Sequence, residues 1–140
     1  MNTRHTGSVD YAWDFYGCRG EVLQLARDAL FETLLRDVKD AQFTLLDHAK
    51  YRFGPDGAIS FLGLISESHV AIHGAPENGK LLEITIHTCV VEGTSDGPTP
   101  EEKKDALIAI WKKRFKPERI HEFEPRRRGV QSVPAMQEED

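Results

Sequence analysis

The sequence has little cysteine and no long hydrophobic run. Only Cys18 and Cys89 occur among 140 residues, too few for the disulfide framework of a small secreted domain, although a single bridge between them is compatible with the sequence. No apolar run approaches the roughly 18 residues of a membrane-spanning helix, and no signal peptide is recognisable. The expected compartment is therefore the cytoplasm, where both thiols stay reduced.

Several ligand-binding motifs are missing as well. The chain has no internal repeat, no glycine-rich phosphate loop and no closely spaced cysteine pair of the kind that binds zinc. His69 and His73 are four residues apart, but they fall in a strand-like segment, where this is not the spacing of a helical metal-binding pair. We therefore expect no metal site.

Positive charge is also in short supply. The chain has 18 Lys and Arg against 23 Asp and Glu, for a net charge of -5. A nucleic acid or an anionic membrane is therefore not the expected partner. Arg126, Arg127 and Arg128 form a local exception, which we interpret as a solvent-exposed run rather than a phosphate site.

The apolar residues predict a mixture of strands and helices. Tyr11, Trp13 and Phe15 alternate with other residues, which is typical of a half-buried strand. Thr99 and Glu102 form a capping box that starts a helix, and Pro117 ends it. The expected strands span residues 10–16, 42–53, 58–65, 70–73, 81–91 and 118–124, and the other expected helix spans residues 21–41.

This order of elements predicts one α+β domain. Short connections between successive strands favour antiparallel pairing, and two amphipathic helices can cover one face of the sheet. We expect a two-layer sandwich over residues 1–125, with residues 1–9 as a loose arm. Residues 126–140 lack a core pattern and are expected to form a polar, disordered tail.

Most of the reactive side chains lie between residues 60 and 89, around Glu67-Ser68-His69. Polar residues in strands are often hydrogen-bonded groups of the core or of a sheet edge that have no catalytic role. Both a structural and a functional interpretation of these residues are therefore open. If residues 68–74 form one strand, Ser68 and His73 face opposite sides of the sheet. A turn or a break at Ser68 would be needed to bring them together.

The segment LISESHVAIHGAPENG, with Thr88-Cys89 after it and Asp14 to Cys18 far before it, resembles the prokaryotic S-adenosylmethionine decarboxylase proenzymes over residues 10–124. The resemblance implies that the chain cuts itself between Glu67 and Ser68. It also implies that Ser68 becomes a pyruvoyl cofactor, which forms a Schiff base with the substrate amine and accepts the electrons released by decarboxylation.

The resemblance also implies roles for individual residues. Ser68 would attack the Glu67 carbonyl, and Ser60 would help to hold the intermediate. His73 would remove the α-proton during elimination, and Cys89 would protonate the decarboxylated product.

Substrate contacts follow from the same resemblance. Phe53 would stack on the adenine, Glu77 would bind the ribose hydroxyls, and Asp14 and Cys18 would line the pocket. Ala75 stands where the family usually carries a second aromatic residue, so one face of the adenine would lack its stacking partner.

Three functions are therefore compatible with the sequence. The first is decarboxylation of S-adenosylmethionine for spermidine biosynthesis. The second keeps the mechanism but uses L-arginine or L-ornithine, as Ala75 would allow. The third is a regulatory or binding homologue that does not process itself. The resemblance also implies a homodimer of processed protomers.

Overall fold

The structure is a computed structural model that describes residues 4–54, 57–75, 81–92 and 96–129. Its elements, in chain order, are β1 (Arg4–Tyr16), the 3₁₀ helix η1 (Glu21–Gln24), α1 (Arg27–Asp40), β2 (Leu45–Arg52), β3 (Ile59–Ile65), β4 (Ser68–Ala75), β5 (Leu81–Glu92), α2 (Pro100–Phe115), β6 (Arg119–Glu122) and β7 (Arg126–Gly129).

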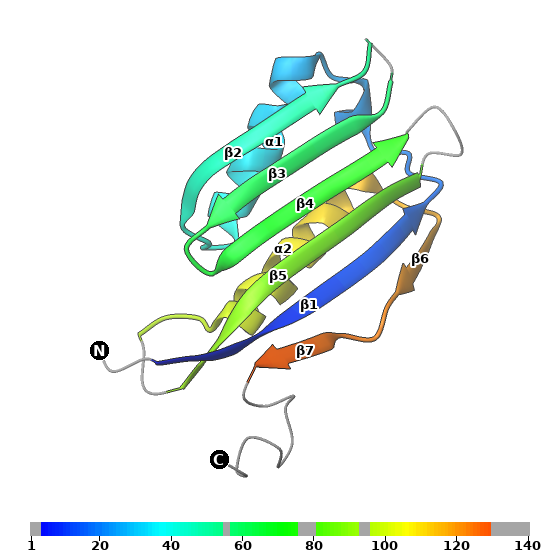
Figure 1. Ribbon diagram of the computed structural model, residues 1–140. Helices are drawn as coiled ribbons and strands as arrows, with labels where there is room; N and C mark the ends of the chain where they lie inside the picture. The colour runs from blue at the N-terminus through cyan, green and yellow to red at the C-terminus, as the bar shows by residue number, and fades with distance from the viewer. Residues whose placement is uncertain (1–3, 55–56, 76–80, 93–95, 130–140) are drawn as a thin grey trace.

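The strands form one antiparallel sheet in the order β2-β3-β4-β5-β1-β6, and β7 pairs with β1 next to β6. Both α-helices cover the same face of this sheet and leave the other face open (Figure 1). The predicted α+β two-layer sandwich is therefore confirmed. Among the described helices, none combines the length and the apolar character needed to cross a membrane.

The core lies between the sheet and the helices. Alternate residues of each strand point to opposite faces, so β3 buries Ile59, Phe61, Gly63 and Ile65, while the residues between them are more exposed. Aromatic contacts join the layers: the rings of Phe31 and Phe61 lie 6.3 Å apart, and those of Phe15 and Phe115 lie 6.4 Å apart.

The start of α2 follows the sequence prediction. The Thr99 hydroxyl accepts a hydrogen bond from the Glu102 amide at 3.1 Å, and the Glu102 carboxylate accepts one from the Thr99 amide at 2.8 Å. This capping box satisfies two amide groups that have no partner within the helix. The helix ends at Phe115, because Lys116 adopts the left-handed conformation with φ of 47°.

The first predicted helix is interrupted. Residues 21–24 form η1, and α1 begins only at Arg27 after two extended residues. Arg52 is buried on β2 and donates hydrogen bonds to the carbonyls of Leu23 and Leu25, both at 3.1 Å. Because these carbonyls are satisfied from another strand, the chain does not need a continuous helix here.

The sheet is longer than the sequence indicated. Residues 4–9 belong to β1 and pair with β5, so they are not a loose arm. Residues 126–129 form β7 and pair with residues 7–10 of β1, so this part of the predicted tail is sheet. Backbone pairing needs no apolar pattern, which explains why these segments were missed. Residues 130–140 lie outside the described residues.

We predict that Phe115→Ala lowers the free energy of unfolding by about 3–5 kcal/mol, because it leaves a cavity between α2 and β1. Urea denaturation would measure this in a Ser68→Ala background, so that a single uncut chain unfolds. Lys112→Ala on the exposed side of α2 is the control and should change stability by no more than about 0.5 kcal/mol. Equal effects of the two substitutions would contradict the described packing.

Candidate active site

The turn between β3 and β4 holds the predicted cleavage site. Ser66 and Glu67 form the turn, and Ser68 opens β4. Ser68 has a φ of 147°, a conformation that residues with a side chain rarely adopt. Such strain persists only where the surrounding structure enforces it, and it is concentrated at functional sites. Here it falls on the residue that follows the predicted scissile bond.

The carbonyl of Glu67 is bound by a neighbouring strand. The Cys89 amide of β5 donates a hydrogen bond to this carbonyl oxygen at 2.8 Å. If Ser68 attacked the carbonyl carbon, negative charge would develop on that oxygen. A backbone donor already aimed at this position is the arrangement that stabilises an oxyanion.

The side chain of Glu67 anchors the turn to the helix layer. Its carboxylate accepts hydrogen bonds from Lys103 of α2 at 2.5 Å and from the Ser66 hydroxyl at 3.0 Å. Burial acts to raise the pKa of Glu67, but the hydrogen bonds from Lys103 and Ser66 outweigh it and hold the pKa below its usual value. Glu67 is therefore charged at neutral pH, and its carboxylate fixes the turn.

A row of polar side chains begins at Ser68. The Ser68 hydroxyl oxygen lies 3.3 Å from Nδ1 of His69. The ring of His69 stacks on that of His87 with centroids 4.9 Å apart and planes 4° apart. His87 in turn makes a hydrogen bond through Nδ1 to Asp10. Four residues from three strands thus form one chain of contacts that ends at the serine.

Cys89 lies beside the turn and is half-buried. Burial and, to a smaller extent, the charge of Glu67 raise the pKa of this thiol, so it keeps its proton at neutral pH. A cavity of about 220 Å³ opens next to Cys89, between the ends of β1 and β5 and the start of α2. A protonated thiol beside an open space can act as an acid.

Ser60 and His73 form a second cluster. The Ser60 hydroxyl lies 3.1 Å from Nδ1 of His73, and the two residues are opposite each other on β3 and β4. Tyr51 of β2 is opposite Ser60, and its ring lies 4.6 Å from that of Phe53. A shallow cavity of about 210 Å³ runs past Tyr51, Ser60 and His73.

The two clusters do not meet within one chain. Ser68 and His73 are five residues apart on the same strand, which corresponds to about 16 Å at a rise of about 3.3 Å per residue. The conformation of Ser68 therefore does not bring His73 to it. The structure joins Ser68 with Cys89 at one end of the sheet and Ser60 with His73 at the other.

Comparison with known proteins decides the family, since the sequence profile described as S-adenosylmethionine decarboxylase matches residues 10–128. The chain belongs to the S-adenosylmethionine decarboxylase family. The S-adenosylmethionine decarboxylase proenzyme of Pyrobaculum aerophilum is 31% identical over 111 residues, which cover 79% of each chain. That of Aquifex aeolicus is 36% identical over 76 residues, 54% of each chain. The crystal structure of the Aquifex aeolicus adenosylmethionine decarboxylase superposes with a TM-score of 0.65 at 26% identity and covers 91% of this chain and 94% of that one.

The residues expected to contact the substrate do not all lie in one place. Phe53 and Asp14 lie at the same end of the sheet as His73: Phe53 follows β2, and Asp14 pairs with Glu83, which pairs with His73. Cys18 is in the core with 1% of its surface exposed, and its thiol lies 3.6 Å from the Phe15 carbonyl oxygen. Its role in lining the pocket stays a prediction. Glu77 lies outside the described residues. No disulfide joins Cys18 and Cys89.

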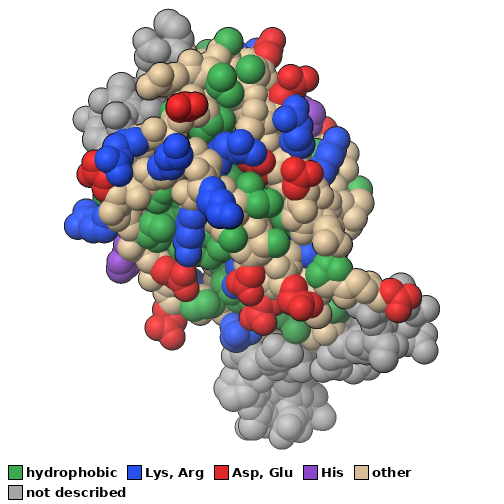
Figure 2. Space-filling view, turned by 180° about the vertical axis from the view of Figure 1, so that it is seen from behind, with side chains coloured by type: hydrophobic (Ala, Val, Ile, Leu, Met, Phe, Trp, Pro, Cys, Tyr) green, Lys and Arg blue, Asp and Glu red, His purple; other side chains and the backbone are tan. Residues whose placement is uncertain are grey.

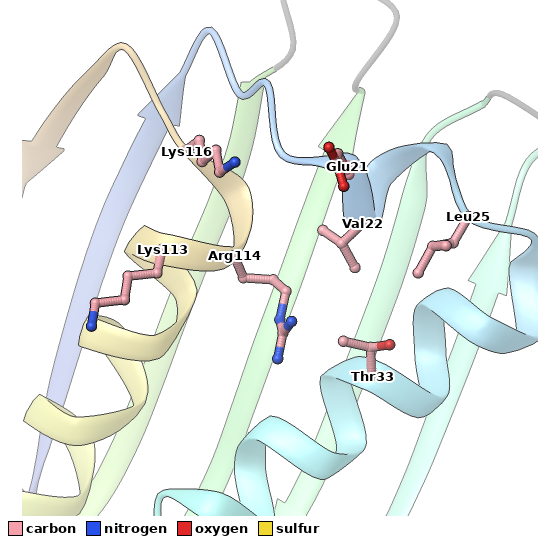
Figure 3. Close-up of a pocket in the computed structure, with 7 residues that line it drawn as sticks. All are labelled: Glu21, Val22, Leu25, Thr33, Lys113, Arg114 and Lys116. Atoms are coloured by element: carbon pink, nitrogen blue, oxygen red, sulfur yellow. The ribbon is translucent and has the colours of Figure 1, made fainter.

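The helix face carries a cavity that involves none of the predicted site residues. It has a volume of about 300 Å³ and lies between η1, α1 and the end of α2 (Figure 3). Lys and Arg side chains gather on this face (Figure 2), but Arg114 is held by the fully buried Asp37 through hydrogen bonds of 3.0 and 2.6 Å. We assign this pair a structural role. No cluster of metal-ligating side chains occurs in the described part of the chain.

Sequence reasoning counted His69 and His87 among the reactive side chains of residues 60–89 but gave neither a role, and it did not single out Asp10 or Lys103. The signal lay in the strand register, which places His69 opposite His87 and His87 opposite Asp10. Lys103 reaches Glu67 from a helix 36 residues further along the chain. A residue pattern along one segment does not contain these contacts between segments.

We predict that Lys103→Met, in a Ser68→Ala background, lowers the melting temperature most at neutral pH. The lowered pKa of Glu67 means that its ion pair contributes stability above the unfolded value near 4.5 and loses it as the pH falls through the folded pKa. Thermal unfolding from pH 7 to pH 3 should show that the difference in melting temperature between the Ser68→Ala protein and its Lys103→Met variant becomes smaller. Lys112→Met is the control, and a gap that is independent of pH would contradict the assigned ion pair.

Proposed function

We propose that this chain is a self-processing, pyruvoyl-dependent decarboxylase of S-adenosylmethionine that serves polyamine biosynthesis, including spermidine, in the cytoplasm. The observation that carries the proposal is the turn at Glu67-Ser68, where a strained serine follows a carbonyl already bound by the Cys89 amide. Family membership supports the same reaction class.

The proposed cleavage uses groups that the structure holds in place. Ser68 Oγ attacks the Glu67 carbonyl carbon, and the Cys89 amide stabilises the oxygen as charge develops on it. The Lys103 contact keeps the turn in position during this step. Cleavage would leave one fragment that ends at Glu67 and another that begins at residue 68.

The residues present fit a pyruvoyl group at position 68, because the serine that would supply it stands at the start of a strand next to a half-buried thiol. Such a group supplies a ketone that binds the substrate amine and accepts electrons as CO₂ leaves. Cys89 retains its proton at neutral pH and can deliver it to the product carbon. Ser60 and His73 remain the proposed groups for the processing steps that follow attack.

Because Ser60 and His73 lie far from Ser68 along the same strands, we propose that they act on Ser68 of a second copy. The open sheet face has the character of an interface, since Tyr51, Leu62 and Leu64 are 56%, 45% and 49% exposed. Two copies packed through this face in opposite directions would bring His73 of one subunit to Ser68 of the other. The proposal is thus a homodimer whose two active sites are shared.

The substrate is proposed from the family and from one side chain. The relatives described above are named S-adenosylmethionine decarboxylases, and Phe53 exposes 57% of its surface at the edge of the Ser60 and His73 cluster. An exposed ring can stack on an adenine base. Ala75 removes one aromatic contact, but the relatives named above are S-adenosylmethionine decarboxylase proenzymes, which does not favour arginine, ornithine or a homologue that does not process itself.

We predict that Ser68→Ala abolishes both cleavage and decarboxylation. Intact-mass measurement of the unsubstituted protein should give two fragments, with the second blocked at residue 68 by a carbonyl that borohydride reduces. The processed protein should release CO₂ from S-adenosylmethionine and none from arginine or ornithine.

Thr33→Ala, which removes a hydroxyl bound to its own helix, is the matched control and should cleave normally. Decarboxylation by the Ser68→Ala protein would contradict the cofactor assignment. Release of CO₂ from a basic amino acid alone would replace the proposed substrate.

We predict that two inactive variants restore each other. The Ser68→Ala and His73→Ala chains should each remain uncut when produced separately. If the site is shared, the Ser68 of a His73→Ala chain meets the intact His73 of its Ser68→Ala partner when the two are produced together. Mass spectrometry should then detect cleavage of the His73→Ala chain, and its absence in a verified mixed dimer would show that the site is not shared.

A further inference from the structure

We infer that His69 is the catalytic base of self-cleavage, a role that rests on the proposed function. In this role Nδ1 of His69 accepts the Ser68 hydroxyl proton as the oxygen attacks the Glu67 carbonyl. The contact of 3.3 Å between the two atoms supplies the geometry. A base must lie within hydrogen-bonding reach of the proton that it removes, and slightly long contacts are usual before the reaction.

The unusual backbone of Ser68 explains how neighbouring residues can make this contact. Adjacent side chains in a regular strand point to opposite faces, which would separate the hydroxyl from the imidazole. With a φ of 147°, Ser68 departs from the regular strand, and its hydroxyl lies beside His69. The strain at the cleavage site therefore has a specific consequence, since it places the nucleophile against a base.

The imidazole of His69 is held from the opposite side. His87 is directly opposite His69 on β5, and the two rings are nearly parallel at 4.9 Å. Asp10 is opposite His87 on β1 and forms a hydrogen bond to its Nδ1. His87 and Asp10 are thus positioning residues: they fix the plane of the His69 ring without touching the reacting atoms.

Burial and the neighbouring His87 keep the base neutral. Burial, together with the charge that His87 carries when protonated, lowers the pKa of His69, and Asp10 opposes this only in part. Asp10 also faces Arg128 of β7, with 3.9 Å between the charged groups, and Arg126 is opposite Asp10. Neutral imidazole at physiological pH has a free nitrogen lone pair and can take the serine proton.

The step balances without any external reagent. The bond from Ser68 Oγ to the Glu67 carbonyl carbon forms, and the hydroxyl proton passes to His69. The bond from that carbon to the nitrogen of residue 68 then breaks, and the same proton passes from His69 to the leaving nitrogen. The product is an ester between residues 67 and 68 with a free amine, and His69 returns to its starting state.

This assignment separates His69 from His73 in time. His69 acts before the ester exists, whereas His73 is proposed to act afterwards, in the elimination. A chain without His69 should therefore stop as an intact amide, and a chain without His73 should stop as an ester. Hydroxylamine cleaves esters but leaves amides intact, so it distinguishes the two arrested states.

The experiment follows newly synthesised full-length chains by intact-mass spectrometry, with and without hydroxylamine. His69→Phe keeps a ring against His87 and should slow cleavage by about 100-fold or more, in the range of general-base contributions. Hydroxylamine should cut the His73→Ala chain between residues 67 and 68 but not the His69→Phe chain. His48→Phe, an exposed histidine on β2, should cleave at the normal rate.

The pH dependence of cleavage tests the positioning residues. Cleavage should fail at low pH, where His69 is protonated. His87→Phe retains the stacked ring but removes the neighbouring charge, so the pKa of His69 should rise and the acid limb of the rate profile should move to higher pH. Asp10→Asn removes a negative charge and should move that limb to lower pH. A merely structural role would slow cleavage without moving the limb.

Loss of cleavage through misfolding of a His69 variant can be distinguished from loss of the base. Circular dichroism monitors folding, and His69→Ala leaves space at a half-buried position, so added imidazole should restore part of its cleavage. Normal cleavage of His69→Phe, or hydroxylamine cleavage of it at residue 67, would overturn the role of His69. Failure of the unsubstituted chain to cleave at all would instead overturn the proposed function.

Discussion

The structure depends on one hydrogen bond between strands, from the Cys89 amide to the Glu67 carbonyl. It extends the pairing of β4 and β5 by one step, into the turn that precedes Ser68. Without these contacts the Glu67 carbonyl could bind water instead, and the backbone of the turn could adopt a more favourable conformation. Because β5 and the Lys103 side chain both hold Glu67, the turn cannot relax, and Ser68 keeps a backbone conformation that would otherwise be unfavourable.

The same pairing divides the open face of the sheet. One polar row crosses it through His69, His87 and Asp10, and another crosses it at Ser60 and His73. Between them lies a row of smaller groups that includes Ala71 and Thr85, which are opposite each other. The two ends of an eight-residue strand lie too far apart for one site, which is why the proposed active site takes residues from two copies.

The sequence was sufficient for the architecture because periodicity records which face each residue buries. Phe61 and Trp111 could be assigned to a core from spacing alone. The capping-box pattern of Thr99 and Glu102 predicted the start of α2, because its hydrogen bonds join residues close in sequence. The interruption before α1 could not be predicted, since its cause, Arg52, lies on a strand far from it in sequence. The contacts of Ser68 likewise depend on strand register. The sequence motif therefore pointed to Ser68 and Cys89 as candidates but could not predict which side chains contact them.

A site built in this way must survive its own reaction. The strain at Ser68 stores about 1–3 kcal/mol, which would be released if residue 68 became a chain end in the proposed cleavage. The proposed cleavage would also remove the covalent link between β3 and β4, but the pairings of β3 with β2 and β4, and of β4 with β5, could still hold the fragments. Glu67 would then carry a terminal carboxylate as well as its side chain, with Lys103 and the Cys89 amide positioned to bind the added charge. The contacts that strain the intact chain are therefore the ones that can hold the two fragments together afterwards.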